Sequence, residues 1–189
     1  MIFRVLQFDR ARANSIPFHL GKALSGCDKL RQVEMGGFRM DLTGEERITA
    51  PRDVVWAALN DPEVLKQCIP GCQSLEMKSP TELTAVVKVK IGPVSATFNG
   101  EVLLSNIKAP QSYTISGEGK GGIAGFAKGG ADVVLKDDGG ETVLQYEAKA
   151  QVGGKIAQLG ARLIDSTSTK LAQQFFSSFN AAVSAKAAE

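Results

Sequence analysis

The stretch that decides the fold of this chain is residues 155–185, which read KIAQLGARLIDSTSTKLAQQFFSSFNAAVSA. Its apolar residues return at helical spacing, so we expect one amphipathic helix of about thirty residues from Lys155 to near Ala185. A long stretch with the pattern of antiparallel strands precedes it. A sheet followed by one long helix has one economical arrangement, in which the sheet curls around the helix and buries its apolar side. Such a fold usually leaves a cavity, which favours binding of a hydrophobic molecule over chemistry on it.

The two halves of the expected helix present different apolar faces. In the first half, Leu159 and Leu163 lie on the same side. In the second half, the apolar side is rotated by roughly a third of a turn, at about 100° per residue. We predict that the first half closes the cavity. A phenylalanine cluster in the second half is expected to seal the far end or to meet a partner, and its members are Phe175, Phe176 and Phe179.

The chain between residues 40 and 153 predicts about seven strands. A first strand over Asp41–Thr49 is followed by two short helices, one after Pro51 through Leu59 and one over Glu63–Cys68. The next eighty residues or so alternate apolar and polar side chains, which is the pattern of a sheet with one face in water. Residues 137–140, Asp-Asp-Gly-Gly, predict the hairpin turn between the last two strands, because glycine supplies the positive φ that tight turns need.

The chain divides at Met40 into an N-terminal extension, residues 1–39, and one domain, residues 40–189. The extension shows no sustained periodicity, so we expect either a flexible segment or a start codon assigned too far upstream. It carries seven Lys/Arg and three Asp/Glu, net +4, whereas the domain carries fifteen and seventeen, net −2. A domain of net −2 without a basic cluster lacks the charge pattern of a nucleic-acid binder. No secretory or membrane-spanning segment is evident, and we expect a cytoplasmic protein.

Two motifs raise other functions, and the residues around them favour neither. Residues 117–122 match G-x-G-x-x-G, but a strand and not a helix follows them, so we interpret these glycines as bends in two strands and not as a nucleotide site. Cys68 and Cys72 are four positions apart, and a zinc site would have to recruit Cys27 and His19 from the extension, so no metal site is predicted. Cys68 is expected to be buried and Cys72 to begin a strand, with a reversible disulfide between them left open.

Residues 40–189 contain no histidine, which removes the usual general base, so no catalytic residue is predicted. The best polar candidates lie beside the glycine-rich turn, where Glu118 and Lys128 are predicted at the cavity mouth. The aromatic residues that share the apolar faces suit either a filled core or a cavity wall. Together with Leu159 and Leu163, the predicted cavity wall consists of Trp56, Phe98, Tyr113, Phe126 and Tyr146.

Four spaced stretches carry a family resemblance: residues 61–72, 88–94, 117–129 and 152–160. Through them the chain, over about residues 40 to 185, resembles the CoxG family of carbon monoxide dehydrogenase, within the START-like, Bet v 1-like (SRPBCC) superfamily. The resemblance implies an α+β helix-grip fold, with a seven-stranded antiparallel sheet curled around a long C-terminal helix and two short helices after strand one. This agrees with the order of elements deduced from the periodicity.

The resemblance also implies a function. It points to a non-catalytic accessory protein of a carbon monoxide dehydrogenase or related molybdenum hydroxylase, which binds a quinone or a lipid without a covalent cofactor. Membrane recruitment or electron delivery would be its task, with transient contact at the inner face of the cytoplasmic membrane through an exposed cavity rim. Two alternatives remain open: a maturation or scaffolding factor that acts by protein contact, and a small enzyme of the cyclase or hydrolase kind.

Overall fold

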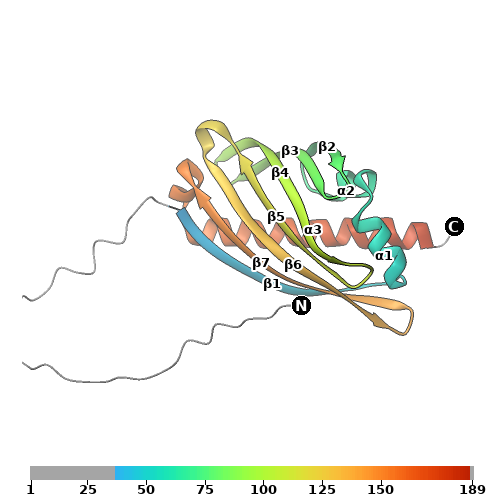
Figure 1. The fold of residues 1–189 in the computed structure, drawn as a ribbon. Helices are drawn as coiled ribbons and strands as arrows, with labels where there is room; N and C mark the ends of the chain where they lie inside the picture. The colour runs from blue at the N-terminus through green and yellow to red at the C-terminus, as the bar shows by residue number, and fades with distance from the viewer. Residues whose placement is uncertain (1–36, 188–189) are drawn as a thin grey trace, which may run out of the picture. The chain divides into compact units, whose positions relative to one another are not determined.

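A computed structural model describes residues 37–187 of the chain and shows one sheet with a long helix against its concave side (Figure 1). Two short helices follow the first strand, as predicted. The strands are β1 (Gly37–Ile48), β2 (Cys72–Ser79), β3 (Glu82–Ile91), β4 (Val94–Lys108), β5 (Ser112–Lys120), β6 (Phe126–Asp138) and β7 (Glu141–Gly153). The helices are α1 (Arg52–Leu59), α2 (Pro62–Cys68), the 3-10 turns η1 (Gly122–Ala124) and η2 (Gly154–Leu159), and α3 (Ala161–Ala187).

The seven strands form a single antiparallel sheet in the order β1-β7-β6-β5-β4-β3-β2. Every neighbouring pair except β1 and β7 is consecutive in the chain, and that pair brings the first and last strands together with Met40 opposite Ala150. The helix-grip fold predicted from the sequence is confirmed. β1 begins at Gly37, three residues before the predicted boundary, because backbone pairing with Gly153 needs no apolar side chain. The rest of the predicted extension lies outside the described residues.

Local sequence signals fix the two short helices and the last hairpin. Asp61 caps α2 by accepting hydrogen bonds from the backbone N–H groups of Glu63 and Val64, and Pro62 occupies the first turn. Lys186, near the end of α3, donates to the same Asp61 carboxylate at 2.7 Å, and this bond lowers the pKa of Asp61. The hairpin between β6 and β7 has Gly139 and Gly140 at positive φ, as the Asp-Asp-Gly-Gly motif predicted.

The long helix is shorter than predicted at its N-terminal end. The residues from Gly154 to Leu159 form the 3-10 turn η2, and Gly160 then adopts φ +88° before α3 begins at Ala161. Only glycine takes this backbone conformation readily, so Gly160 separates the turn from the helix. The apolar periodicity continues across the break because Ile156 is still buried against the sheet. The pattern alone therefore could not place the start of the helix.

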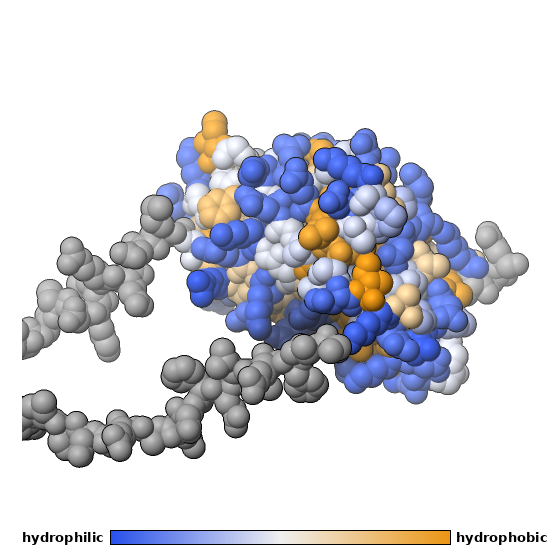
Figure 2. Space-filling view, in the orientation of Figure 1, coloured by the Kyte–Doolittle hydropathy of each residue, from blue (hydrophilic) through white to orange (hydrophobic). Residues whose placement is uncertain are grey.

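Two clusters of buried side chains hold α3 against the sheet. In the first, Phe179 and Val183 are completely buried and pack with Ile48, Leu135 and Leu144. The second lies at the other end of the helix and is built on Val152, Ile156 and Ile164. The opposite face of the sheet carries polar side chains, and Figure 2 shows a mostly hydrophilic surface with separate hydrophobic spots. The sheet thus buries one face only, as its period-two pattern predicted.

The fold depends on Phe179, whose side chain is 0% exposed. We expect Phe179→Ala to lower the free energy of unfolding by about 3–5 kcal/mol, the usual effect of removing a buried phenylalanine. Urea denaturation followed by circular dichroism measures this change. Ser178→Ala, at the exposed neighbouring position of α3, is the matched control. A loss no larger than that of the control would contradict this account of the core.

Candidate functional site

An apolar cavity lies between the concave face of the sheet and the second half of α3, with a volume of about 340 Å³. Residues from six strands, from α1 and α2, and from α3 enclose it. Its lining consists of Leu59, Asn60, Leu65, Ile69, Leu75, Met77, Leu83, Ala85, Val102, Leu104, Tyr113, Ile115, Ala131, Val133, Leu144, Tyr146, Phe175 and Phe176. None of these side chains carries a charge at neutral pH.

Small residues on the concave face leave the space open. Ala85 and Ala131 line the cavity with a methyl group each, where a larger residue would reach toward the helix. In the next cross-strand row, Gly117 pairs with Gly129. A Cβ atom at Gly129 would collide with the carbonyl oxygen of Lys149, so only glycine permits the close approach of β6 to β7 there. The glycine-rich segment therefore shapes the sheet, in agreement with the interpretation of its sequence.

Two tyrosines supply most of the cavity's polar character. Tyr113 is 6% exposed, and Trp56 packs edge-on against it with ring centroids 5.4 Å apart. Tyr146 stacks on Phe176 at 5.2 Å and lies over Gly44, where a Cβ atom would collide with the tyrosine oxygen. Burial raises the pKa of both tyrosines, and for Tyr146 the nearby Glu46 carboxylate raises it further. Both hydroxyls therefore stay protonated and can donate a hydrogen bond.

Neither tyrosine hydroxyl has a hydrogen-bond partner among residues 37–187. The third polar group of the lining, Asn60, donates its amide N–H to the carbonyl oxygen of Trp56 at 2.8 Å. A polar group without a partner in an apolar site is unfavourable, and an acceptor atom on a ligand would satisfy it. The cavity thus suits an apolar molecule with one or two oxygen acceptors.

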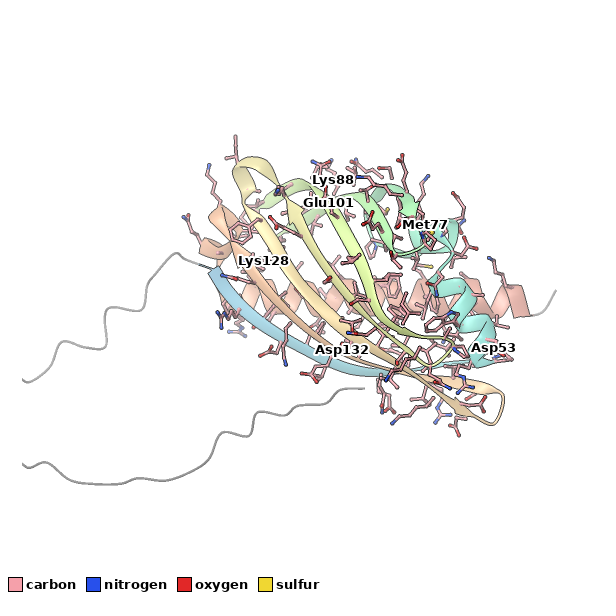
Figure 3. All side chains as sticks on the ribbon, viewed as in Figure 1. Asp53, Met77, Lys88, Glu101, Lys128 and Asp132 are labelled. Carbon is pink, nitrogen blue, oxygen red and sulfur yellow. The ribbon has the colours of Figure 1, made fainter. Side chains whose placement is uncertain are left out.

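The cavity reaches solvent between α2 and β2. Met77 is a lining residue with 38% of its surface exposed, and it is labelled in Figure 3 on β2. Leu65 and Ile69 of α2, which also line the cavity, are half-buried. These three side chains form the rim. A flexible apolar chain attached to a bound ring could leave the cavity past them.

The structure brings only some of the predicted cavity residues together. Tyr113 and Tyr146 line the cavity, and Trp56 stands behind Tyr113. Phe98 and Leu159 instead pack against the second cluster, at the opposite end of the concave face. Two further predicted residues also lie toward that end: Phe126, whose ring lies next to Gly153, and Leu163, which lies next to Gly92.

The two halves of the long helix have roles opposite to those expected. Phe175 and Phe176 of the second half line the cavity, whereas Ile164 of the first half belongs to the second cluster. The sequence pattern predicts Phe175 and Phe176 at the far seal and not in the wall. Their position at adjacent places on the apolar side of α3 was the signal. Its meaning depended on which end of the helix the cavity occupies, and periodicity does not give that.

Glu118 and Lys128 lie directly opposite each other on β5 and β6, on the outer face of the sheet. Side chains alternate along a strand, and Tyr113 and Ile115 of β5 point into the cavity, so position 118 points away from it. Lys128 is labelled in Figure 3 on the same side as Glu101. The structure therefore places the predicted mouth residues on the solvated surface, and the apolar rim described above takes their place.

Cys68 and Cys72 are free thiols. Cys68 is 2% exposed in the first cluster, and Cys72 begins β2 with its thiol donating to the carbonyl oxygen of Ser74 at 3.4 Å. Burial raises the pKa of both thiols, which lowers their reactivity at neutral pH. Within residues 37–187, no three His, Cys, Asp or Glu side chains are grouped so that they could hold a metal ion.

A scan against family models matches residues 44–184 to the CoxG family of carbon monoxide dehydrogenase. No curated protein matches the chain. Among solved structures, a conserved protein from Geobacillus kaustophilus is similar with a TM-score of 0.72 and 28% identity, over 77% of this chain and 95% of that one.

Two more distant structures share the fold alone. A START superfamily protein from Mycobacterium smegmatis has a TM-score of 0.59 and 14% identity, over 76% of this chain and 97% of that one. The ZhuI aromatase/cyclase from Streptomyces sp. R1128 has a TM-score of 0.56 and 10% identity, over 78% and 94%. In the part of the chain that the structure describes, no helix combines the length and apolar character needed to cross a bilayer.

The raised pKa of Tyr113 predicts a loss of stability in alkali. An unfolded tyrosine loses its proton near pH 10, whereas buried Tyr113 keeps it, so the unfolded state binds fewer protons above pH 10. The contribution is therefore fully present below about pH 10 and is lost as the pH rises further. Denaturation at increasing pH should show a steeper loss for the wild type than for Tyr113→Phe. Tyr146→Phe, at the other tyrosine of the chain, should have a smaller effect.

Tyrosinate absorbance of the folded protein gives an independent check, because the chain has two tyrosines only. We expect Tyr113 to remain un-ionised at a pH at which an exposed tyrosine has titrated. Ionisation of both tyrosines near pH 10 in the folded protein would contradict the buried position of Tyr113.

Proposed function

This chain belongs to the CoxG family of carbon monoxide dehydrogenase, and from that membership and the apolar cavity we propose that it is a non-catalytic, ligand-binding accessory protein. Its partner is a carbon monoxide dehydrogenase or a related molybdenum hydroxylase. Its ligand is a quinone or another lipid with a ring at one end. By carrying this ligand the protein assists electron delivery from the enzyme or its recruitment to the membrane.

The size of the cavity supports a ring and not a whole isoprenoid lipid. Its volume of about 340 Å³ lies near the lower end of the range found for ligand pockets. An apolar cavity of about 150 Å³ accepts benzene, so a little more than twice that volume suits a fused pair of rings. The isoprenoid chain of a quinone would extend past the rim at Met77, Leu65 and Ile69.

The lining carries the proposal, because its two polar hydroxyls complement a quinone. A quinone ring is apolar on its faces and has two carbonyl oxygens that accept hydrogen bonds. Tyr113 and Tyr146 are neutral donors, and Phe176 offers an aromatic face beside Tyr146. Each hydrogen bond formed in the cavity would contribute about 0.5–1.5 kcal/mol, and ring burial would add the hydrophobic share.

The composition of the cavity also argues against the enzymatic alternative. The fold is shared with an aromatase/cyclase, but the likeness at 10% identity concerns the fold alone. No carboxylate, imidazole or amine lines the cavity of this chain within the described residues. Proton transfer would have to use tyrosines whose pKa is raised well above neutrality, which opposes acid-base work near pH 7.

Filling the cavity should abolish ligand binding without changing the outer surface. We expect Ala131→Phe to weaken binding of a naphthoquinone with a short prenyl chain by about tenfold or more, equivalent to about 1.4 kcal/mol. Val134→Phe adds an aromatic ring on the outer face of the same strand and should leave affinity unchanged. Quenching of Trp56 fluorescence measures binding, because this single tryptophan lies against Tyr113.

The same variants separate the carrier from the scaffolding alternative. Affinity capture of the molybdenum hydroxylase from the native host should succeed with the wild type, and quinone should be extracted with it. If neither variant changes quinone affinity, or if the wild type shows no saturable quenching, the cavity is not the ligand site. Hydroxylase capture by such a protein would then assign its function to protein contact.

A further inference from the structure

Three loops meet at the end of the domain that lies away from the cavity rim, and we call this surface the loop end. It consists of residues 90–95 at the turn between β3 and β4, residues 119–126 around η1, and residues 153–163 around η2. Gly125 lies against Gly153 and Gly154, and Gly92 lies against Leu163. These contacts show that the three loops form one surface.

The loop end exposes one large apolar side chain far more than any other described part of the chain does. Ile123 is 82% exposed, whereas the other exposed large apolar residues range from 38% for Met77 to 46% for Leu103. Its neighbour Ala124 packs against the second core cluster, so η1 is anchored by Ala124 and turns Ile123 outward. Figure 2 shows a hydrophobic knob that projects at the upper left, where the connection between β5 and β6 lies in Figure 1.

The charges around Ile123 all have the same sign. The three loops carry four exposed cations and no carboxylate, as their sequences KIGPVS, GKGGIAGF and GGKIAQLGARL show. The nearest acidic positions along the chain are Glu118, whose carboxylate lies 3.9 Å from Lys120 on the outer face of the sheet, and Asp165 in the first turns of α3. The four cations are Lys90, Lys120, Lys155 and Arg162.

From these observations we propose that the loop end is a docking surface for an anionic lipid bilayer. An exposed isoleucine surrounded by lysine and arginine matches the two parts of such a surface, because the apolar side chain enters the acyl boundary while the cations meet the headgroups. Neither contact needs a membrane-spanning helix. The binding is weak and reversible, because one side chain and four charges supply it.

This proposal deepens the membrane-recruitment part of the proposed function, on which its biological purpose rests. The contact itself requires neither the cavity ligand nor the hydroxylase. The assay with vesicles below can therefore fail while the cavity proposal stands. Equally, Ala131→Phe can abolish quinone binding without changing the association with vesicles.

Co-sedimentation of the full chain with vesicles tests the surface. The wild type should bind vesicles of equal parts phosphatidylglycerol and phosphatidylcholine, should not bind pure phosphatidylcholine, and should dissociate as salt is raised. Ile123→Ser should weaken the partition by about tenfold, with Leu103→Ser, exposed on the outer face of the sheet, as its control. The double variant Lys120→Glu/Lys155→Glu should weaken the partition by about tenfold or more.

A charge-matched control separates the loop end from net charge and from the basic N-terminal residues. Lys66→Glu/Lys136→Glu makes the same change of charge at exposed positions of α2 and β6. We expect it to retain vesicle binding. Equal losses in the two double variants, or no binding of the wild type to the anionic vesicles, would overturn the proposal. Retained hydroxylase capture that Lys120→Glu/Lys155→Glu abolishes would then assign the surface to an acidic protein partner.

Discussion

The structure depends on how one straight helix fits inside a curved sheet. Close packing is achieved at the two ends of α3, where Phe179 and Val183 are sealed by the first cluster and Ile164 by the second. Between these ends the sheet bows away from the helix and places small residues such as Ala85 and Ala131 opposite it. The cavity is thus a consequence of gripping a rod at two points. Core stability and ligand space are supplied by different residues of the same faces, so one can change without the other.

The balance of polar groups follows from the same geometry. An interior this apolar tolerates few hydrogen-bonding groups, and the ones it contains have different degrees of satisfaction. Thr142 is completely buried but donates to the carbonyl oxygen of Ala50 at 2.7 Å, which ties β7 to the segment before α1. Tyr113 and Tyr146 have no such partner among the described residues. Polar groups with a structural task are therefore paired, and the unpaired ones are those that face the cavity.

Most of the fold was predictable because two periods, two and 3.6 residues, carry the information about strands, helix and buried faces. The site was less predictable because periodicity assigns a side chain to a face and not to a place along it. Phe98 and Tyr113 both point inward from neighbouring strands, yet the first lies beside Gly121 and the second opposite Val133. Only the strand register separates them. Glu118 shows the opposite error, since its nearness to the glycine-rich turn was weighted above its place in the alternation.

The register also separates the two proposed surfaces. Leu83 on β3 lines the cavity opposite Met77, and Ile91 ends the same strand at the loop end, eight residues further on. At about 3.3 Å per residue, the strand spans up to about 26 Å between them. A bilayer in contact with the loop end would leave the cavity rim clear of lipid. A ligand held with its chain past Met77 would then face the aqueous side, where a protein partner could approach it. Membrane contact and ligand transfer need not compete for one surface, because the length of the strands keeps them apart.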